Sequence, residues 1–461
     1  MGPMEVPSDA LYGASTQRAV LNFPVSGYHF GREFIRALGM IKWAAAEANL
    51  ELGRLDEERA TLIARAAEEV MEGKHDAHFP IDIYQTGSGT STNMNANEVI
   101  ANLCSQFAGK PVGSRDPVHP NDHVNMGQSS NDVIPTAIHI AVAERIRKFL
   151  MPALEALDGA LERKALEFWE VIKIGRTHLM DATPVRLGQE FLGYAKQIEY
   201  ARLRAGNAIA ALEELPLGGT AVGTGLNCHP DFASIVMRHL WHKTSIAFKE
   251  ARNHFEAQAA KDGVVQASGQ LKTIAVSLTK VANDIRWLGS GPRCGIGEIL
   301  LPETQPGSSI MPGKVNPVMS EAVLQVCAKV IGNDATITWA AANLSNFELN
   351  VGMPVIAQSL LESVRLLTNV VTIFREKCVV GIKANISRCA ELVEYSMAMV
   401  TSLVPLIGYD RAAEIAKESQ KTGRTVREIC REWNVLPEEE LRKALDPADM
   451  TKPGGEGAAG G

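Results

Sequence analysis

The feature that most constrains this chain is an apolar stripe of helical period that runs unbroken from residue 264 to residue 288. Its members are Val264, Ala267, Leu271, Ile274, Leu278, Val281, Ile285 and Leu288. Steps of three and four residues place all of them on one face of an α-helix. At about 1.5 Å per residue such a helix is roughly 37 Å long, so it cannot bury its stripe alone. A bundle of long, nearly parallel helices, within one chain and between chains, is the economical solution.

Other segments repeat this rhythm, and we interpret each stripe as core packing, not as a cofactor site. The repeats lie within Phe34–Ala48, Phe191–Leu212 and Leu360–Phe374. Alternating patterns typical of strands are scarce, and short strands are expected at Lys173–Gly175 and Ile81–Tyr84. The sequence therefore predicts an all-α fold.

Length and composition bound the class of protein. The 461 residues, 46% of them hydrophobic, exceed what one simple core usually supports, so two or three domains are expected. No run of about 18 uncharged apolar residues occurs, and the start, MGPMEVPSDALYG, lacks the features of a targeting segment. We therefore expect a cytoplasmic protein. A net charge of −7 without a dense basic run argues against nucleic acid as a partner.

The spacing of cysteines and histidines does not indicate a metal site. The seven cysteines are scattered and never at CxxC spacing, which indicates reduced thiols without a zinc or disulfide framework. His75 and His78 are three residues apart but have no further ligand cluster beside them. We interpret both as surface residues.

The motif GSSIMPGKVNP, residues 307–317, is the most specific feature of the chain. It resembles a phosphate loop only superficially, because five residues separate Gly307 from Gly313. In addition, Val315 stands where Ser or Thr should follow the lysine. Nucleotide binding is therefore not expected.

What this motif offers instead is a set of groups suited to an anion. Two hydroxyls, Ser308 and Ser309, precede the cation Lys314 and the amide Asn316. Pro317 suits the first turn of a helix that continues through Glu321. A cation beside a helix N-terminus makes an anion site, and a glycine-rich surface loop is the alternative interpretation.

Three other polar segments between the helical stripes are candidates for function. Thr177 and His178 lie in GRTHLMDATP, where the imidazole can move protons near neutral pH or serve structure alone. Ser88-Gly89-Thr90 and Ser129-Ser130-Asn131 are rich in small donors that suit a carboxylate. Each cluster can equally cap a helix, and in the second Asn131 or Asp132 suits the N-cap position.

Five motifs in one order resemble the fumarase/aspartase superfamily and, within it, the class II fumarases. They are TGSGTSTNMNANEV, HPNDHVN..QSSND, KIGRTHLMDATP, GGTAVGTGLNCHP and GSSIMPGKVNP. FELNVGMPV and the stretch around PEEELRKALDPADM match as well, so the resemblance runs from about residue 3 to 452. The Thr177-His178 pair separates fumarases from aspartases, which usually carry Gln after that Thr.

The resemblance implies a three-domain fold in which a central long-helix bundle assembles into a twenty-helix core of a homotetramer. Its domains would be an N-terminal lyase domain, 1–128, a central helical-bundle domain, 129–387, and a small C-terminal helical domain, 388–461, with a disordered tail. Active sites would combine segments from three chains. No metal and no organic cofactor are implied.

The resemblance also implies an activity and the residues that carry it. It implies reversible hydration of fumarate to L-malate through an aci-carboxylate intermediate, with Ser308 as the base and His178, paired with Glu321, handling the water. Substrate-binding positions would be Ser88, Thr90, Ser129, Ser130, Asn131, Thr177, Ser309, Lys314 and Asn316. A secondary carboxylate site would comprise His119, Asn121 and Asp122. Gly307 and Gly313 are expected to be hinges of a segment, 303–316, that closes over substrate.

Two departures from the family pattern stand out. Asp116 occupies the place of an arginine three residues before His119, although Arg115 is adjacent, and this bears on the secondary site. Met126-Gly127 replaces a Lys-Ser pair common before Gln128. The alternatives are aspartate ammonia-lyase and a structural or binding protein that kept the fold without activity. The second is opposed by the intact residues Ser308, His178, Lys314 and Glu321.

Overall fold

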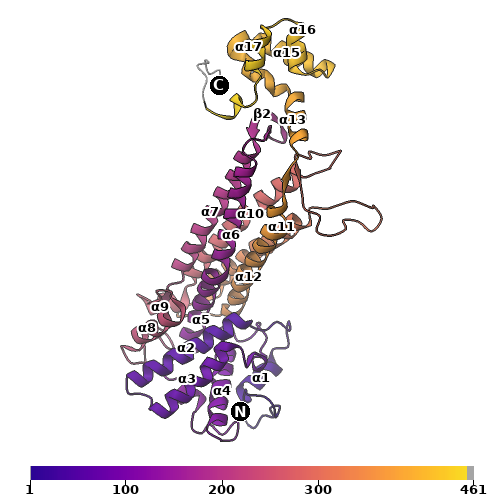
Figure 1. The fold of residues 1–461 in the computed structure, drawn as a ribbon. Helices are drawn as coiled ribbons and strands as arrows, with labels where there is room; N and C mark the ends of the chain where they lie inside the picture. Colours follow the sequence, from indigo (N-terminus) through magenta and orange to yellow (C-terminus); the bar gives the residue numbers. More distant parts are fainter. Residues whose placement is uncertain (1, 454–461) are drawn as a thin grey trace. The chain divides into compact units, whose positions relative to one another are not determined.

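The computed structural model describes residues 2–453 and is predominantly helical, which confirms the predicted all-α class (Figure 1). Most of the predicted C-terminal tail lies outside the described residues. Within these residues, five long helices carry the predicted stripes or follow the GSSIMPGKVNP motif: α2 (Arg32–Glu51), α7 (Leu187–Ala210), α10 (Asp262–Leu288), α11 (Val318–Asn343) and α12 (Met353–Lys377). Every stripe residue of α10 from Val264 to Leu288 is buried. The periodicity therefore located both the helix and its packed face.

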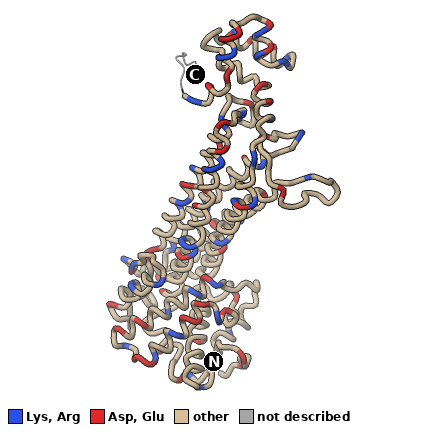
Figure 2. The backbone as a smooth tube through the Cα atoms, in the orientation of Figure 1, with Lys and Arg blue, Asp and Glu red and all other residues tan. Residues whose placement is uncertain are grey.

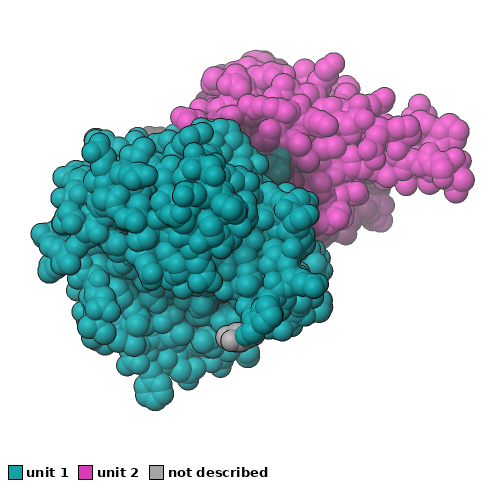
Figure 3. Space-filling model, turned by 90° about the horizontal axis from the view of Figure 1, so that it is seen from below, with its two compact units in different colours: residues 1–152, 201–276, 326–369 teal, residues 153–200, 277–325, 370–461 magenta. Residues whose placement is uncertain are grey.

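The chain divides into two compact units that interleave in sequence (Figure 3). Unit 1 comprises Met1–Pro152, Ala201–Val276 and Val326–Asn369; unit 2 comprises Ala153–Tyr200, Ser277–Gln325 and Val370–Gly461. Because α7, α10, α11 and α12 each have residues in both units, this division does not follow the three predicted segments. The three-domain organisation stays a prediction.

Unit 1 is a helical assembly around α2, whose buried face runs from Phe34 to Asn49. α2 packs on α3, α5 and α8, and α4 packs on α1, α3 and α5. The elements are α1 (Ala14–Asn22), α2 (Arg32–Glu51), α3 (Glu57–Glu72), η1 (Asp76–His78), α4 (Thr90–Phe107), η2 (Pro120–Val124), α5 (Ser130–Arg145), η3 (Ile146–Leu150), β3 (Glu214–Leu215), α8 (Phe232–Thr244), β4 (Lys249–Glu250), α9 (His254–Ala259), β6 (Ser345–Asn346) and β7 (Leu349–Asn350).

Unit 2 combines a β-hairpin with short C-terminal helices. The antiparallel strands β1 and β2 pack against α13, η5 and η6. The elements are α6 (Met151–Glu167), which starts in unit 1, β1 (Ile172–Thr177), β2 (Met180–Arg186), β5 (Ile299–Leu300), η4 (Val379–Gly381), β8 (Lys383–Ala384), α13 (Ile386–Tyr395), η5 (Met397–Leu403), α14 (Val404–Ile407), α15 (Tyr409–Thr422), α16 (Val426–Glu432), α17 (Glu438–Ala444) and η6 (Asp449–Thr451).

One of the two predicted strands is confirmed and the other is wrong. Lys173–Gly175 lies inside β1. At Ile81–Tyr84 the structure has a single bridge, between Asp82 and His29. The carboxylate of Asp82 accepts backbone N–H bonds from Ser26, Gly27 and Tyr84, so this segment turns around a side chain instead of extending a ladder.

The C-terminal helices of unit 2 have their own core, formed by residues such as Val393, Met399, Leu403 and Ile415. No single helix within residues 2–453 is long and apolar enough to cross a membrane; one bent pair, Ile386–Tyr395 with Met397–Ile407, passes the length and composition test only when joined across a 67° bend. Val393, Met399 and Leu403 of this pair are buried in the C-terminal core.

The sequence made two predictions about the surface: charges without a dense basic run, and surface positions for His75 and His78. Lys and Arg are interspersed with Asp and Glu along the described part of the chain (Figure 2). The interpretation of His75 and His78 as surface residues holds only in part, because both are half-buried. His75 Nε2 lies 2.9 Å from Glu69 Oε2, and His78 Nδ1 accepts the N–H of Leu11. Their polar tips are used for local structure.

Candidate functional site

Three hydroxyls meet where α4 and α5 begin in unit 1. Ser88 Oγ lies 2.8 Å from Thr90 Oγ1, which lies 2.6 Å from Ser130 Oγ. Ser129 and Asn131 flank Ser130 on the first turn of α5. The structure thus brings together all five predicted donors of unit 1, and we call Ser88, Thr90, Ser129, Ser130 and Asn131 the donor shelf.

The start of α5 is fixed by a capping box, and the N-cap is Ser129. The predicted N-cap at Asn131 or Asp132 is therefore wrong. Ser129 Oγ accepts the N–H of Asn131, while Asp132 Oδ1 accepts the N–H of Ser129 at 2.9 Å. Asp132 Oδ2 also accepts the N–H groups of Gly218 and Thr220. This buried carboxylate therefore ties the shelf to the GGTAVGTG segment, and burial raises its pKa to about 6.

Glycines shape the backbone under the shelf. A Cβ at Gly87 would overlap the carbonyl oxygen of Val351, so only glycine permits this approach. Gly89 has φ +70° at the N-cap position of α4 and faces Ile134. A cavity of about 410 Å³ opens beside the shelf, lined by Thr90, Ser129, Ser130 and nine other residues.

In unit 2, Thr177 and His178 lie at the tip of the β1–β2 hairpin. Thr177 pairs with Met180, which leaves His178 and Leu179 as a two-residue turn. Their φ values are +56° and +61°, as a type I′ turn requires, although Asn-Gly is the favoured pair there. Left-handed backbone at two side-chain-bearing residues is strained, and such strain is concentrated at functional sites. The imidazole is held out in an exposed position.

A buried ion cluster supports this hairpin. The guanidinium of Arg176 binds both carboxylate oxygens of Glu298, which has no exposed surface. Lys173 Nζ lies 3.2 Å from Glu298 and 2.8 Å from Glu190. Burial raises the pKa of Glu190, while Lys173 opposes that rise. The backbone that carries Thr177 and His178 is therefore anchored directly behind the turn.

The GSSIMPGKVNP segment of unit 2 is an organised loop. Gly307 N donates to Lys314 O at 2.8 Å, and Asn316 Nδ2 donates to Gly307 O at 2.7 Å. A Cβ at Gly307 would overlap the carbonyl oxygen of Lys314, whereas Gly313 has φ +76°. Close backbone approach at Gly307 and a left-handed turn at Gly313 thus explain the two glycines; their role as hinges stays a prediction.

Ser308 occupies a particular place in this loop. Its Oγ accepts the N–H groups of Ile310 at 3.2 Å and Met311 at 3.1 Å. Lys314 and Ser308 both line a cavity of about 460 Å³, and Ser309 is exposed beside it. Two N–H donors aimed at one hydroxyl oxygen favour negative charge on that oxygen.

Glu321 lies in the first turn of α11, which begins at Val318, with Pro317 immediately before it. Glu321 is exposed, as is His178. Within residues 2–453 of this single chain, no hydrogen bond or ion pair links their side chains. The predicted His178–Glu321 pair is therefore not assembled by one chain and stays a prediction.

The predicted secondary site lies at η2. His119 is the N-cap residue, and its Nδ1 accepts the N–H groups of Asn121 and Asp122. Asn121 and Asp122 are exposed. Asp116 makes an ion pair with Lys110 at 3.2 Å. The three predicted residues are thus neighbours, but the structure gives the His119 ring a capping role.

Sequence reasoning missed the charges behind these segments: Lys42 behind the shelf and the Lys173–Arg176–Glu298 cluster behind His178. Lys42 follows Leu38 by one helical turn on the apolar stripe of α2, a signal that could have identified it.

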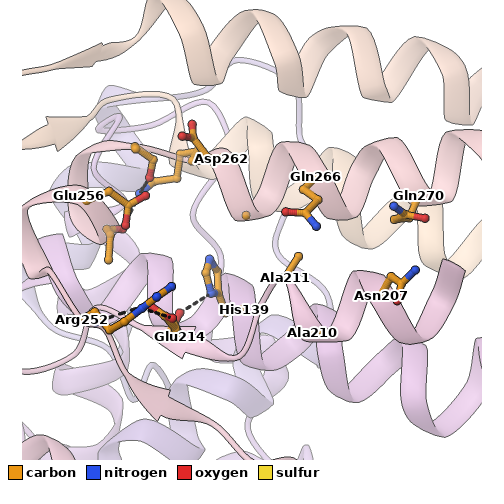
Figure 4. A pocket seen from close by; sticks show the side chains of 14 residues that line it. His139, Asn207, Ala210, Ala211, Glu214, Arg252, Glu256, Asp262, Gln266 and Gln270 are labelled. Atoms are coloured by element: carbon orange, nitrogen blue, oxygen red, sulfur yellow. Dashed lines mark hydrogen bonds and ion pairs between the residues drawn. The ribbon is translucent and has the colours of Figure 1, made fainter. Parts of the chain in front are cut away.

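A separate cavity of about 440 Å³ in unit 1, around His139 and Gln266, contains none of the predicted site residues (Figure 4). Among residues 2–453, no cluster of three or more His, Cys, Asp or Glu side chains could hold a metal ion.

Comparison with known proteins matches this arrangement to one family. The Lyase family matches residues 2–332, and the Fumarase C C-terminus family matches residues 399–452. The fumarate hydratase class II of Neisseria meningitidis is 51% identical over 98% of both chains, and that of Halobacterium salinarum is 54% identical over 98% of this chain and 96% of the relative. The crystal structure of class II fumarase from Schistosoma mansoni superposes with a TM-score of 0.93 at 40% identity over 96% of each chain. The chain therefore belongs to the class II fumarase family of lyases.

Proposed function

We propose that this enzyme hydrates fumarate reversibly to L-malate by anti addition of water. The observation that carries the proposal is the strained turn that keeps the imidazole of His178, next to Thr177, exposed at the tip of the hairpin. The chain is also about half identical to proteins named fumarate hydratase class II. A positioned imidazole suits water as the group that is added or lost. The substrates are small dicarboxylates.

The donor shelf binds one carboxylate of the substrate. Each carboxylate oxygen accepts two hydrogen bonds, and Ser88, Thr90, Ser130 and the first N–H groups of α5 supply neutral donors in one place. Ser129 and Asn131 complete the shelf, and Thr177 adds a hydroxyl beside His178. A monocarboxylate would leave part of this set unpaired.

The loop 303–317 acts at C3 of malate, where the proton beside a carboxylate is very weakly acidic. Ser308 removes the C3 proton, and the N–H groups of Ile310 and Met311 support the negative oxygen that this role needs. The resulting aci-carboxylate is held by Ser309, Lys314, Asn316 and backbone N–H groups, which stabilise charge where it develops. The segment closes over substrate when it binds.

Water is activated by His178 with Glu321 orienting its imidazole. Because both side chains are exposed and no bond links them within residues 2–453, a second copy supplies one of them. Exposed apolar residues at several tips, Leu179, Met180, Ile310 and Phe347, support burial against other copies. We infer a homotetramer with shared sites, acting in the cytoplasm, with a secondary carboxylate site at His119, Asn121 and Asp122.

The test is the product formed from fumarate in ammonium buffer that contains a chelator. Chiral chromatography should show L-malate, with little aspartate, at a rate that the chelator does not change. Aspartate as the main product would assign the chain to the ammonia-lyases instead. Activity lost with the chelator would mean that a metal takes part.

A further inference from the structure

Lys42 of α2 is an ammonium group in the interior of unit 1. Its side chain has no exposed surface, and Nζ donates to Asn125 Oδ1 and Gln128 Oε1, both at 2.9 Å. Within the described part of the chain it makes no ion pair. Removing an ammonium from water costs several kcal/mol, and here two neutral carbonyl oxygens replace the water.

The two amide partners are held with their carbonyls toward Lys42. Asn125 Oδ1 also accepts from Asn93 Nδ2 at 3.1 Å and Asn97 Nδ2 at 3.2 Å. Gln128 Nε2 donates to two backbone carbonyls at 3.1 and 3.2 Å, which fixes the opposite end of that amide. The orientation is therefore set by several bonds and not by Lys42 alone.

These amides are also part of the wall of the shelf cavity. Asn125 and Gln128 line the 410 Å³ cavity together with Thr90, Ser129 and Ser130. All twelve residues of unit 1 that the structure places around this cavity are uncharged. The side chains of Asn125 and Gln128 therefore separate Lys42 from the cavity. In these buried surroundings the effective dielectric constant is low, which strengthens the interaction of the Lys42 charge with a bound ligand.

Asp132, the carboxylate whose charge acts on Lys42, is engaged elsewhere. Its carboxylate accepts three backbone N–H groups, from Ser129, Gly218 and Thr220, at the positive end of α5. Burial lowers the pKa of Lys42 to about 7, and the charge of Asp132 opposes this fall. A carboxylate in the cavity would favour the protonated form of Lys42.

We propose that Lys42 is a specificity-determining residue of the donor shelf: its buried ammonium, acting through Asn125 and Gln128, makes the shelf prefer a carboxylate over a neutral amide of the same shape. This inference rests on the proposed function, in which the shelf binds one carboxylate of fumarate. Lys42 touches no substrate, so its role is electrostatic and positional.

The experiment compares succinate with its monoamide, succinamate, in calorimetric titrations of the full-length protein and of Lys42→Met. Methionine keeps an unbranched stem and removes the charge. We expect Lys42→Met to bind succinate roughly 10-fold more weakly while succinamate affinity stays within about twofold. In fumarate kinetics, KM should rise by a similar factor while kcat changes by less than about threefold. An unchanged preference for succinate would overturn the proposal.

Three further variants distinguish the charge of Lys42 from the loss of any buried ammonium and from an error in the shelf assignment. Lys42→Arg keeps the charge and should restore most of the preference. Lys164→Met removes another buried ammonium, bound to the carbonyl of Ile382 in unit 2, and should leave both affinities unchanged. Ser130→Ala tests the shelf itself. If Ser130→Ala has no effect on either ligand, the shelf assignment fails; if it weakens succinate binding while Lys42→Met does not, only the role of Lys42 fails.

A measurement on the unaltered protein covers the case in which no Lys42 variant folds. Asp132 is the charged group that acts on Lys42 from the elements packed on α2. The preference for succinate over succinamate should fall as the pH rises from 6 to 8.5, because Lys42 then loses its proton in the free protein. A preference that is constant over this range would overturn the proposal.

Discussion

Arg176 and Glu298 form a bidentate ion pair behind the turn that carries His178, with Nη1–Oε2 and Nη2–Oε1 distances of 2.8 and 3.2 Å. Glu298 has no exposed surface and also lies 3.2 Å from Lys173 Nζ. It directly precedes β5, which leads into the loop of Ser308. One carboxylate thus fixes the base of two segments proposed to take part in catalysis.

Replacing this carboxylate should destabilise the protein more than breaking an exposed ion pair does. Glu298→Gln leaves Arg176 and Lys173 without their shared anion, and breaking a buried pair costs roughly 3–5 kcal/mol. The free energy of unfolding from urea titration at fixed protein concentration measures the effect. Glu170→Gln, which breaks the exposed pair of Arg186 with Glu170, is the matched control and should cost less than about 1 kcal/mol.

The two variants also differ in their expected activity. If the cluster positions His178, then Glu298→Gln should lower kcat under conditions where the protein is still folded, and Glu170→Gln should not. Equal stability of the two variants would contradict the account of the buried cluster.

The sequence predicted the long helices well because their information is local. The stripe of α10 is read from spacing alone, and all its members are buried as expected. The two halves of the donor shelf were also predicted, since small donors cluster within Ser88–Thr90 and within Ser129–Asn131; that the halves meet is a contact between residues forty apart. The N-cap was misplaced by two or three residues because Ser129, Asn131 and Asp132 are all good caps, and only the reciprocal bond of Asp132 to Ser129 N decides among them.

What could not be predicted depends on contacts between residues far apart in the chain. Lys42 meets Asn125 and Gln128 across more than eighty residues, and Arg176 meets Glu298 across more than a hundred. Spacing carries no information about such partners. The strand expected at Ile81–Tyr84 failed for a similar reason, because Asp82 bonds to the backbone of Ser26 and Gly27.

Gly87 should tolerate no side chain. In Gly87→Ala the methyl group would overlap the carbonyl oxygen of Val351, so the backbone before Ser88 must shift. We expect a loss of about 1–3 kcal/mol in the free energy of unfolding together with weaker substrate binding. Gly206→Ala, in α7 with open space around its Cβ position, is the control and should raise stability by up to about 1 kcal/mol. Similar effects of both changes would refute the steric argument.

His139 should make stability depend on pH below neutrality. Burial, and after it the charge of Lys261, together lower its pKa from 6.5 to about 4. Its Nδ1 lies 3.2 Å from the carbonyl oxygen of Leu212 and 2.9 Å from that of Glu214, which is labelled with His139 in Figure 4. Between about pH 6.5 and 4 the unfolded chain binds more protons at this site, so the free energy of unfolding falls as the pH falls, by on the order of 3 kcal/mol at most.

Urea titrations at pH 7 and pH 5 measure this effect. His139→Gln should reduce the difference between the two pH values. His242→Gln, on the exposed face of α8, should preserve it. If His139→Gln leaves the pH dependence as it was, another group is responsible.

Cys228 should resist electrophiles even though it directly follows Asn227, which lines the shelf cavity. Burial, together with the charges of Asp132 and Glu250, raises the pKa of its thiol to about 12. The thiolate is the nucleophile, so little of it exists at neutral pH. In timed labelling with N-ethylmaleimide followed by peptide mass spectrometry, exposed Cys294 should react first. Labelling of Cys228 as fast as Cys294 would contradict the assigned pKa.

The last prediction concerns how catalytic residues are shared between chains. His178→Asn and Glu321→Gln should each lower turnover by roughly 10² or more, as expected when a positioned proton transfer is lost. The assembly should persist, because both side chains are exposed in one chain and neither belongs to an apolar stripe.

Mixing the two inactive variants separates a shared site from a site within one chain. If each site takes His178 from one chain and Glu321 from another, random assembly from equal amounts leaves both residues intact in about one quarter of the sites. Denaturing the variants together and refolding them should therefore restore about a quarter of the normal activity. Each variant refolded alone should stay inactive, and so should the two variants refolded apart and then combined without exchange. If one chain supplied both residues, every site would lack one of them and the mixture would stay as inactive as its components. Light scattering on the same samples checks that the mixed protein is a tetramer, so a lack of recovered activity cannot be attributed to failed assembly.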